Sequence, residues 1–424
     1  MKQSYRRFTY WNQSVQDKIA IACCLCMVAG LFFSRALLSM TMLIMFINAL
    51  HPSVVRKNLR EWRNDPFALL SFAFFCTYLV SGLWSDNKDF WIASTINKLP
   101  FAILPFAFLS APLQREQNQR TIIIGAAVMQ IAVIGYSLIQ FGLHTEYYLQ
   151  GYHISRPLPT TRYDDHIRFS LSLVISVLMF CYLLWERHTI PLSRALKIFM
   201  LCSIVLFIAY IHILAAKTGI LCLYLVAIVY ILSKIYRENK RKALLLSLGV
   251  ASLPVIAYYA IPTFKTKIDY VIFEIDKSRS DNRYDYTLSD AGRMITYELG
   301  RKAIAKHPFA GVGAGDLMDE MKAGYSRDYP EVSQDQQYGP INQFMFTALS
   351  VGIPLSLFLA ALAICPFFIR VEKRVYLVAT GIIMLISMTV EAMLELQFGV
   401  FTYLFFLLFW INALKKSSAV TLSP

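Results

Sequence analysis

Long runs of apolar residues, each about the length of a membrane-spanning helix, follow one another along most of the chain. A helix needs about 20 mostly apolar residues to cross a bilayer, and it satisfies its backbone polar groups within the segment. A membrane barrel would instead show short alternating segments. The pattern predicts an all-α integral membrane protein with about twelve spans. These lie at roughly 18–34, 36–51, 67–84, 91–110, 121–142, 167–185, 197–214, 219–234, 243–262, 341–369, 374–390 and 396–414.

One long polar insert interrupts the series. It predicts three parts: an N-terminal bundle of about nine spans at 1–262, a polar loop at 263–340, and a C-terminal bundle of about three spans with a tail at 341–424. A second polar segment, 143–166, precedes the sixth span. A disordered linker is an alternative for the insert, but its sequence favours folded structure with short helices.

Within the insert, the stretch Asp290–Lys306 predicts a helix. Ser289 or Asp290 is suited to cap it, Met294 and Tyr297 share one face with Ile304 and Ala305, and His307-Pro308 ends it. The following Gly311–Gly315 run, Gly-Val-Gly-Ala-Gly, comes after a helix rather than a strand. It is therefore interpreted as a plain turn and not as a dinucleotide-binding motif.

Composition and charge agree with a membrane protein and orient it. Hydrophobic residues make up 57% of the chain and charged residues 16%, against about 25% charged in soluble domains. Lys and Arg gather in every second connecting segment, which predicts that these segments and both termini are cytoplasmic. They are Lys2, Arg6, Arg7 and Lys18; Arg56, Lys57, Arg60 and Arg63; Arg115 and Arg120; Arg187, Arg194 and Lys197; Lys234, Arg237, Lys240, Arg241 and Lys242; Arg370, Lys373 and Arg374; and Lys415 and Lys416.

The formal charge of +14 needs no nucleic acid to explain it. Basic cytoplasmic loops set the topology and meet anionic lipid headgroups, so we expect membrane lipids, and no nucleic acid, as partners. All eight cysteines lie inside predicted spans, and no metal-ligand spacing such as a paired CxxC occurs. We expect neither a disulfide framework nor a metal or cofactor.

Charges at the ends of spans are costly and often functional. Lys217 is either an interfacial lysine that reaches the headgroups or a cation that faces an anionic lipid-linked substrate. Arg293 either pairs with a nearby acid or binds substrate, and the same choice between an interfacial and a functional role applies to His166 and Arg168. His212 is expected to be a packed, hydrogen-bonded side chain. Glu391 and Glu395 either orient cations or face water.

Several motifs resemble the large periplasmic loop of the O-antigen ligase and polymerase family. They are Ser289-Asp-Ala-Gly-Arg293, then His307-Pro-Phe-Ala-Gly-Val-Gly-Ala-Gly-Asp316, and Gly339-Pro-Ile-Asn-Gln-Phe344 running into a span with Val351-Gly-Ile353; Lys217-Thr-Gly219 stands where the family usually has an arginine-containing element. The layout of twelve spans with one long outer loop agrees, and the resemblance is specific in about 60 residues of loop.

The resemblance implies a metal-independent glycosyltransferase with a fold similar to the multi-span GT-C type. Such an enzyme moves a glycan from an undecaprenyl-pyrophosphate carrier to a lipid A-core acceptor, or to another lipid-linked glycan in polymerases. It works at the periplasmic face of the bacterial inner membrane. Carried over, Arg293 and Lys217 clamp the pyrophosphate. His166, at the entrance of a span, is a further candidate catalytic residue that the resemblance itself does not supply. Further candidate substrate-binding residues are Arg168, Asp316, Asn342, Gln343 and Glu391.

Two departures from the family pattern matter. Lys217 keeps the positive charge of the usual arginine but lacks the planar guanidinium, which binds phosphate through two parallel hydrogen bonds. Ile341 stands where the family has the histidine proposed as the base, and isoleucine cannot accept a proton. Either another group such as His166, His307 or Glu391 is the base, or transfer proceeds with little base assistance, or the protein has lost activity.

Three functions therefore compete: a lipid-linked glycan transferase of ligase or polymerase type, a non-catalytic relative that binds the glycan carrier, and a multi-span transporter. A transporter predicts polar or broken helices at the midplane and pseudo-symmetric halves. The sequence shows neither, and Lys98 beside Pro100 is the best exception among midspan charges. The sequence favours the ligase.

Overall fold

The computed structural model describes residues 2–151, 158–160, 165–186, 188–280 and 289–415. Within these ranges the regular elements are all helical, so the predicted all-α class is confirmed. The N-terminal part contains α1 (Lys2–Phe33), α2 (Arg35–Ala49), α3 (Val55–Trp62), α4 (Pro66–Ser81), α5 (Lys88–Phe108), α6 (Glu116–Leu143), α7 (Thr145–Gly151), α8 (His166–Trp185), α9 (Arg194–Leu214), α10 (Lys217–Tyr230), the π-helix η2 (Ile231–Ile235), α11 (Tyr236–Glu238), α12 (Lys240–Ala260) and α13 (Pro262–Ser280).

The remainder begins with two helices of the insert. It contains α14 (Ser289–Lys306), α15 (Leu317–Asp328), η3 (Gln334–Gln336), α16 (Gln343–Val351), α17 (Ile353–Ile364), η4 (Cys365–Phe367), α18 (Val375–Val390), η5 (Met393–Glu395) and α19 (Gln397–Ala413). The predicted helix at 290–306 is thus confirmed as α14. The side chains of Ser289 and Asp290, and residues 152–157 and 161–164 of the segment 143–166, lie outside the described residues.

Seven helices among the described residues are long and apolar enough to cross a membrane, and five more apolar helices are shorter. The long ones are Ser14–Phe33, Lys88–Phe108, Glu116–Leu143, His166–Trp185, Arg194–Leu214, Lys217–Ile235 and Lys240–Ala260; the shorter ones are Arg35–Ala49, Pro66–Ser81, Ile353–Phe367, Val375–Val390 and Gln397–Ala413. Each overlaps one predicted span. The number of membrane crossings and the three-part division remain predictions.

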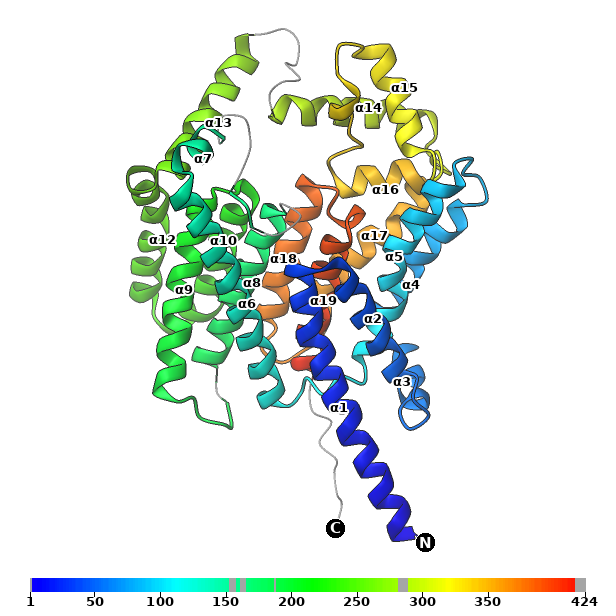
Figure 1. Cartoon of the computed structure of the whole chain (residues 1–424), viewed down its shortest axis with the longest axis vertical. Helices are drawn as coiled ribbons and strands as arrows, with labels where there is room; N and C mark the ends of the chain where they lie inside the picture. The colour runs from blue at the N-terminus through cyan, green and yellow to red at the C-terminus, as the bar shows by residue number, and fades with distance from the viewer. Residues whose placement is uncertain (1, 152–157, 161–164, 187, 281–288, 416–424) are drawn as a thin grey trace.

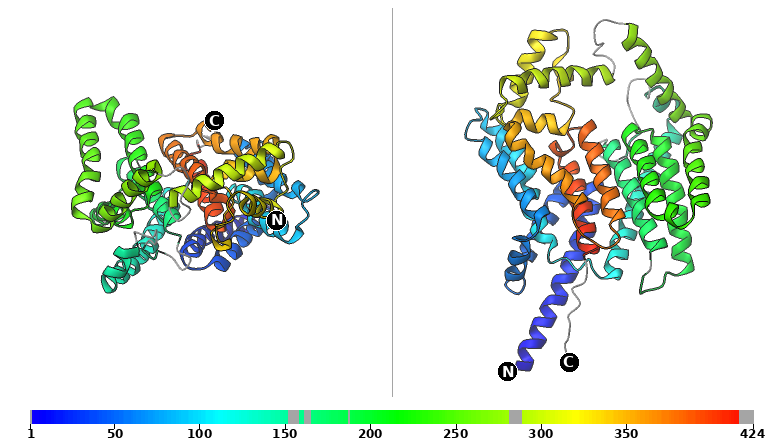
Figure 2. Two further views of the ribbon diagram at one scale, coloured as in Figure 1. Left: turned by 90° about the horizontal axis from the view of Figure 1, so that it is seen from above. Right: turned by 180° about the vertical axis from the view of Figure 1, so that it is seen from behind.

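The helices of the insert lie at one end of the molecule, opposite α3 and the start of α1 (Figure 1). Seen from above, α9, α12 and α13 stand to one side of the bundle, away from α4 and α5 (Figure 2). In contrast, α8 and α19 are buried along most of their length. The start of α8 therefore lies between the peripheral helices and the rest of the bundle.

The insert has a small core of its own, because α14 and α15 pack on each other and on α16. Ile295, Leu299 and Ala303 form the buried face of α14, whereas Met294 is 47% exposed. The predicted face through Met294 and Ala305 is therefore wrong by one position. Leu317, Met321, Tyr325, Val332, Phe346 and Leu349 complete this core.

The predicted tenth span at 341–369 is not one helix. It breaks at Gly352, whose φ of 83° lies in the left-handed region, where glycine has no Cβ to clash. The backbone of Phe309 packs against Gly352. The glycine turn after α14 lies alongside the break, and Gly313 N donates to Ser350 O at 3.0 Å. The plain-turn interpretation of 311–315 fits this packing.

Candidate active site

A pocket of about 320 Å³ lies between the ends of several helices, on the side of the molecule that carries the insert. His166, Lys217 and Arg293 all line it, so the structure brings together the three residues predicted to be catalytic. The other lining residues are Ile167, Ala215, Ala216, Thr218, Leu221, Lys267 and Val390.

A tight junction between α9 and α10 places Lys217. Ala215 has a left-handed backbone with φ of 52°, a conformation that costs a non-glycine residue about 1–2 kcal/mol. Its N–H donates to Ile211 O and His212 O, closing the end of α9. The helix α10 then begins at Lys217. Two residues on, Gly219 lies against Ser170 of α8 so closely that a Cβ would clash with the serine.

A buried carboxylate of α13 faces Lys217. Glu274 is 2% exposed, and its Oε2 lies 3.6 Å from Lys217 Nζ. Lys267, which precedes Glu274 by seven residues on α13, also lines the pocket. Sequence reasoning did not identify either residue as part of the site, since the insert contains many charges and nothing in their spacing singles out these two.

Arg293 reaches the pocket from the first turns of α14. Its Nη1 donates to Val390 O, at the end of α18, at 3.0 Å. Thr296 Oγ1 donates to Arg293 O at 2.8 Å and accepts from Ile341 N at 3.3 Å. The hydrogen bond to Val390 O ties the guanidinium to the end of α18, and Thr296 ties the backbone of α14 to position 341.

Directly after Val390, a buried ionic cluster supports the site. Arg168 Nη1 lies 2.5 Å from Asp165 Oδ1, and Arg168 Nη2 lies 3.4 Å from Glu391 Oε2. All three side chains are nearly buried. Burial raises the pKa of Glu391, while the charges of Arg168 and Arg293 oppose the shift. Glu391 thus orients cations rather than facing water.

The pocket suits an anion for two independent reasons. It is lined by Lys217, Lys267 and Arg293, and it receives the first residues of two helices, His166 of α8 and Lys217 of α10. Unpaired N–H groups and the helix dipole make a helix N-terminus favourable for negative charge. Among the described residues, no group of three or more His, Cys, Asp or Glu side chains is arranged to hold a metal.

Comparison with protein families supports this assignment. Residues 202–360 match the family model described as O-antigen ligase (hereafter the O-antigen ligase stretch). The resemblance to the O-antigen ligase family is thereby confirmed. The matched stretch contains Lys217 and Arg293, whereas His166 and Glu391 lie outside it. A comparison with curated proteins found no match.

Three predicted substrate-binding residues in the O-antigen ligase stretch do not line this pocket. Asp316 accepts hydrogen bonds from the amides of Asp86 and Asn87, both at 2.8 Å. Asn342 caps α16 and donates to Thr389 O at 2.8 Å, while Gln343 is fully buried. Their role in substrate binding remains a prediction.

The three groups considered as a base lie at different distances from this pocket. His166 lines the pocket, and Glu391 follows the lining residue Val390. His307 is at the far end of α14, about 21 Å along the helix from Arg293 at 1.5 Å per residue. Ile341 O accepts from Tyr297 Oη at 2.9 Å. Position 341 is thus fixed beside α14 about one turn beyond Arg293.

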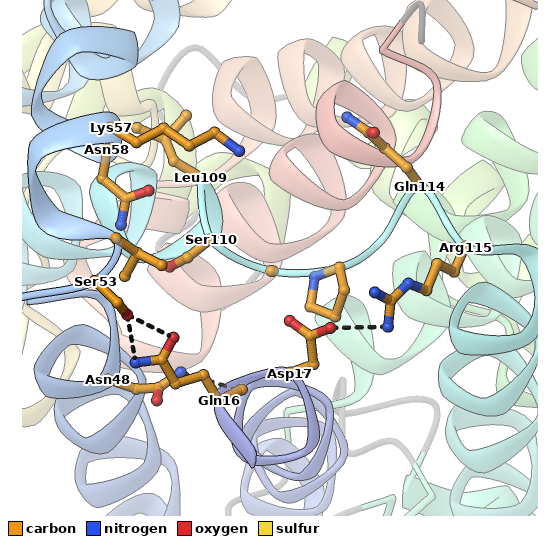
Figure 3. A pocket seen from close by; sticks show the side chains of 13 residues that line it. Gln16, Asp17, Asn48, Ser53, Lys57, Asn58, Leu109, Ser110, Gln114 and Arg115 are labelled. Atoms are coloured by element: carbon orange, nitrogen blue, oxygen red, sulfur yellow. Dashed lines mark hydrogen bonds and ion pairs between the residues drawn. The ribbon is translucent and has the colours of Figure 1, made fainter. Parts of the chain in front are cut away.

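Another pocket, of about 420 Å³, lies at the opposite end of the bundle (Figure 3). Its polar groups bond to one another: Arg115 Nη1 lies 2.8 Å from Asp17 Oδ2, and Gln16 Nε2 donates to Ser53 Oγ at 3.1 Å. Gln16 and Asp17 belong to α1, outside the O-antigen ligase stretch, and none of the predicted site residues lines this pocket. We therefore place the candidate active site in the first pocket.

Proposed function

We propose that this chain is a metal-independent glycosyltransferase of the O-antigen ligase type. It moves a glycan from undecaprenyl pyrophosphate to a lipid A-core acceptor at the periplasmic face of the bacterial inner membrane. The observation that carries the proposal is the meeting of His166, Lys217 and Arg293 in one cationic pocket, two of them inside the O-antigen ligase stretch.

The pocket would stabilise the pyrophosphate leaving group. Negative charge grows on its oxygens as the bond between the sugar and the phosphate breaks, and fixed cations in a poorly hydrated site stabilise that charge. Arg293 offers a planar fork, and Lys217 a point charge. The carbonyl of Val390 orients the arginine, so little reorganisation is needed during the reaction.

His166 is the candidate base for the acceptor hydroxyl, since it shares the pocket with both cations. A positioned base contributes about 10²–10⁴-fold. Glu391 is bound to Arg168 and lies behind the pocket lining, so we assign it to the support of the arginines. The side chain at position 341 cannot act as a base, which leaves His166 to carry that role.

Alternatives of other classes make different demands on the same residues. A polymerase uses the same donor pocket with another lipid-linked glycan as acceptor. A non-catalytic relative would bind the carrier without a base, as Ile341 suggests. A transporter would need polar residues along the midplane of the membrane. The buried midspan cation Lys98 is neutralised by Glu395, whose Oε2 lies 2.8 Å away.

The deciding experiment is surface glycan attachment in a bacterial host deleted for its own ligase. It compares the unaltered chain with Arg293→Ala, Lys217→Arg and Ile341→His. We expect transfer by the unaltered chain and a loss of about 10²–10³-fold for Arg293→Ala, the usual cost of one such donor. Lys217→Arg should retain transfer, because it keeps the positive charge and restores the bidentate guanidinium that the family usually has at this position.

Arg301→Ala is the matched control, because Arg301 is exposed on the same helix, α14. It should transfer as the unaltered chain does. Transfer that appears only with Ile341→His would identify a carrier-binding relative that lacks a base. Equal transfer by Arg293→Ala and Arg301→Ala would contradict the assignment of the pocket.

A further inference from the structure

A fully buried lysine lies in the middle of α5. The side chain of Lys98 has no exposed surface, and its Nζ lies 2.8 Å from Glu395 Oε2 and 4.6 Å from the centre of the Tyr78 ring. Burying two charges costs free energy that their attraction only partly returns. Lys98 and Glu395 are 297 positions apart in the sequence. Because a buried ion pair adds little to the free energy of unfolding, we expect a role of this pair other than stability.

The partner carboxylate belongs to the short turn between α18 and α19, which runs through residues 391–396 (hereafter the 391–396 turn). Glu395 Oε1 accepts from Gln343 Nε2 at 2.8 Å. Gln343 Oε1 accepts from Leu394 N at 2.6 Å, and Asn97 Nδ2 donates to Leu394 O at 3.1 Å. Side chains of α5 and α16 thus fix one end of this turn on both its backbone and its carboxylate.

The other end of the same turn is part of the candidate active site. Glu391 lies beside Arg168, and the preceding carbonyl, Val390 O, holds Arg293. Asn342, next to Gln343, donates to Thr389 O at 2.8 Å. Only three residues separate Glu391 from Glu395, so a shift of the anchored end would move the groups that orient both arginines.

We propose that Lys98, Glu395 and Gln343 form a positioning unit that holds the 391–396 turn and, through it, Arg293 at the cationic pocket that would bind the anionic donor. The inference rests on the proposed function, since it assigns the arginine to a pyrophosphate. None of the three residues lines the pocket, so they act through the turn and not by contact. This gives Gln343 a role other than direct substrate contact.

The test is binding of a short-chain polyprenyl pyrophosphate to the purified full-length chain in detergent micelles. Lys98→Met combined with Glu395→Gln removes both charges together, so that neither is left buried alone. This double variant should stay monodisperse, with a Tm near that of the unaltered chain. It should bind the probe about tenfold or more weakly, because misplacement by about 1 Å can cost 10²-fold.

The chain offers a matched control at its opposite end. Lys234 Nζ lies 2.6 Å from Glu186 Oε1, and Lys234→Met combined with Glu186→Gln removes a lysine–glutamate pair of which neither residue lines the pocket, although the Lys234 side chain is 33% exposed. It should bind the probe as the unaltered chain does. Arg293→Ala tests the pocket itself and should lose binding.

The outcomes separate the two proposals. If Arg293→Ala loses the probe but the Lys98/Glu395 variant, correctly folded, retains full affinity, the positioning role is overturned and the donor pocket stands. Equal losses in the Lys98/Glu395 and Lys234/Glu186 variants would assign both pairs to general stability and also overturn it. If the unaltered chain does not bind the probe, the proposed function fails, and this inference fails with it.

Discussion

At the scale of single residues, the candidate site is built from cations whose carboxylate partners are buried. Glu274 faces Lys217, and Glu391 faces Arg168. Buried carboxylates can hold cationic side chains in fixed positions without covering the pocket side of the site.

Glu391 should make stability depend on pH. Burial raises its folded pKa above the ordinary 4.5, so the folded state keeps this proton to a higher pH than the unfolded chain does. Its contribution to stability is fully present below about pH 4.5 and is lost as the pH rises through the raised folded pKa. Glu391→Gln cannot ionise. Its Tm relative to the unaltered chain should therefore increase as the pH is raised through this window.

The measurement is thermal unfolding of both proteins in the same detergent from pH 4 to pH 8. The groups that face Glu391 include Arg168 and Arg293, which keep their charge throughout this range, and Asp165, which Glu391→Gln leaves in place. Glu320→Gln is the control, because Glu320 lies in the insert beside Lys306. A Tm difference that stays constant or falls as the pH rises would contradict the raised pKa.

The sequence identified some of these residues and could not identify others. Lys217 and Arg293 were predictable, because a charge at the edge of an apolar run or in a family motif stands out. Glu274 did not stand out in a polar insert. The pair Lys98–Glu395 could not be predicted, because contact between residues 297 apart depends on how α5 and α19 pack.

At the scale of the elements, the junction of α8, α9 and α10 decides where Lys217 lies. Gly219 allows α10 to approach α8 at Ser170, and the left-handed Ala215 turns the chain between α9 and α10. A glycine in a predicted span gives no sign of this contact in the sequence. Gly352 is similar, since its break in the tenth span depends on the backbone of Phe309.

Gly219→Ala should therefore disturb both stability and transfer. The added Cβ would clash with the side chain of Ser170, and overpacking of this kind costs about 1–3 kcal/mol. We expect a lower Tm and weaker glycan transfer, since α10 carries Lys217. Adding Ser170→Gly should recover part of both, because it removes the atoms that clash.

Gly249→Ala is the matched control for this prediction. Gly249 lies inside α12, and a Cβ there would meet nothing within 4 Å. Alanine is favoured over glycine in a helix by about 0.5–1 kcal/mol, so the Tm should stay level or rise slightly. A fall in Tm as large as that of Gly219→Ala would show that packing against Ser170 is not the cause.

At the scale of the whole molecule, the basic helix α3 and the polar insert lie at opposite ends of the bundle (Figure 1). Lys57, Arg60 and Lys415 line a pocket together with Glu61 and Asp65, and Lys415 Nζ lies 3.0 Å from Glu61 Oε2. The insert occupies the opposite end (Figure 1). The sequence predicted this separation, because hydropathy and the placement of Lys and Arg are read along the chain without knowledge of packing.

This arrangement predicts which end faces outward. Lys322→Cys places a thiol on an exposed position of α15 in the insert, and Arg60→Cys places one on an exposed position of α3. A membrane-impermeant maleimide applied to intact spheroplasts should label Lys322→Cys and leave Arg60→Cys unlabelled, with both labelled after detergent is added. The unaltered chain is the control for its eight native cysteines, all of which lie within helices. Labelling of Arg60→Cys alone in intact spheroplasts would put the insert in the cytoplasm. The proposed transfer at the periplasmic face would then be wrong, because the cationic pocket opens at the end that carries the insert.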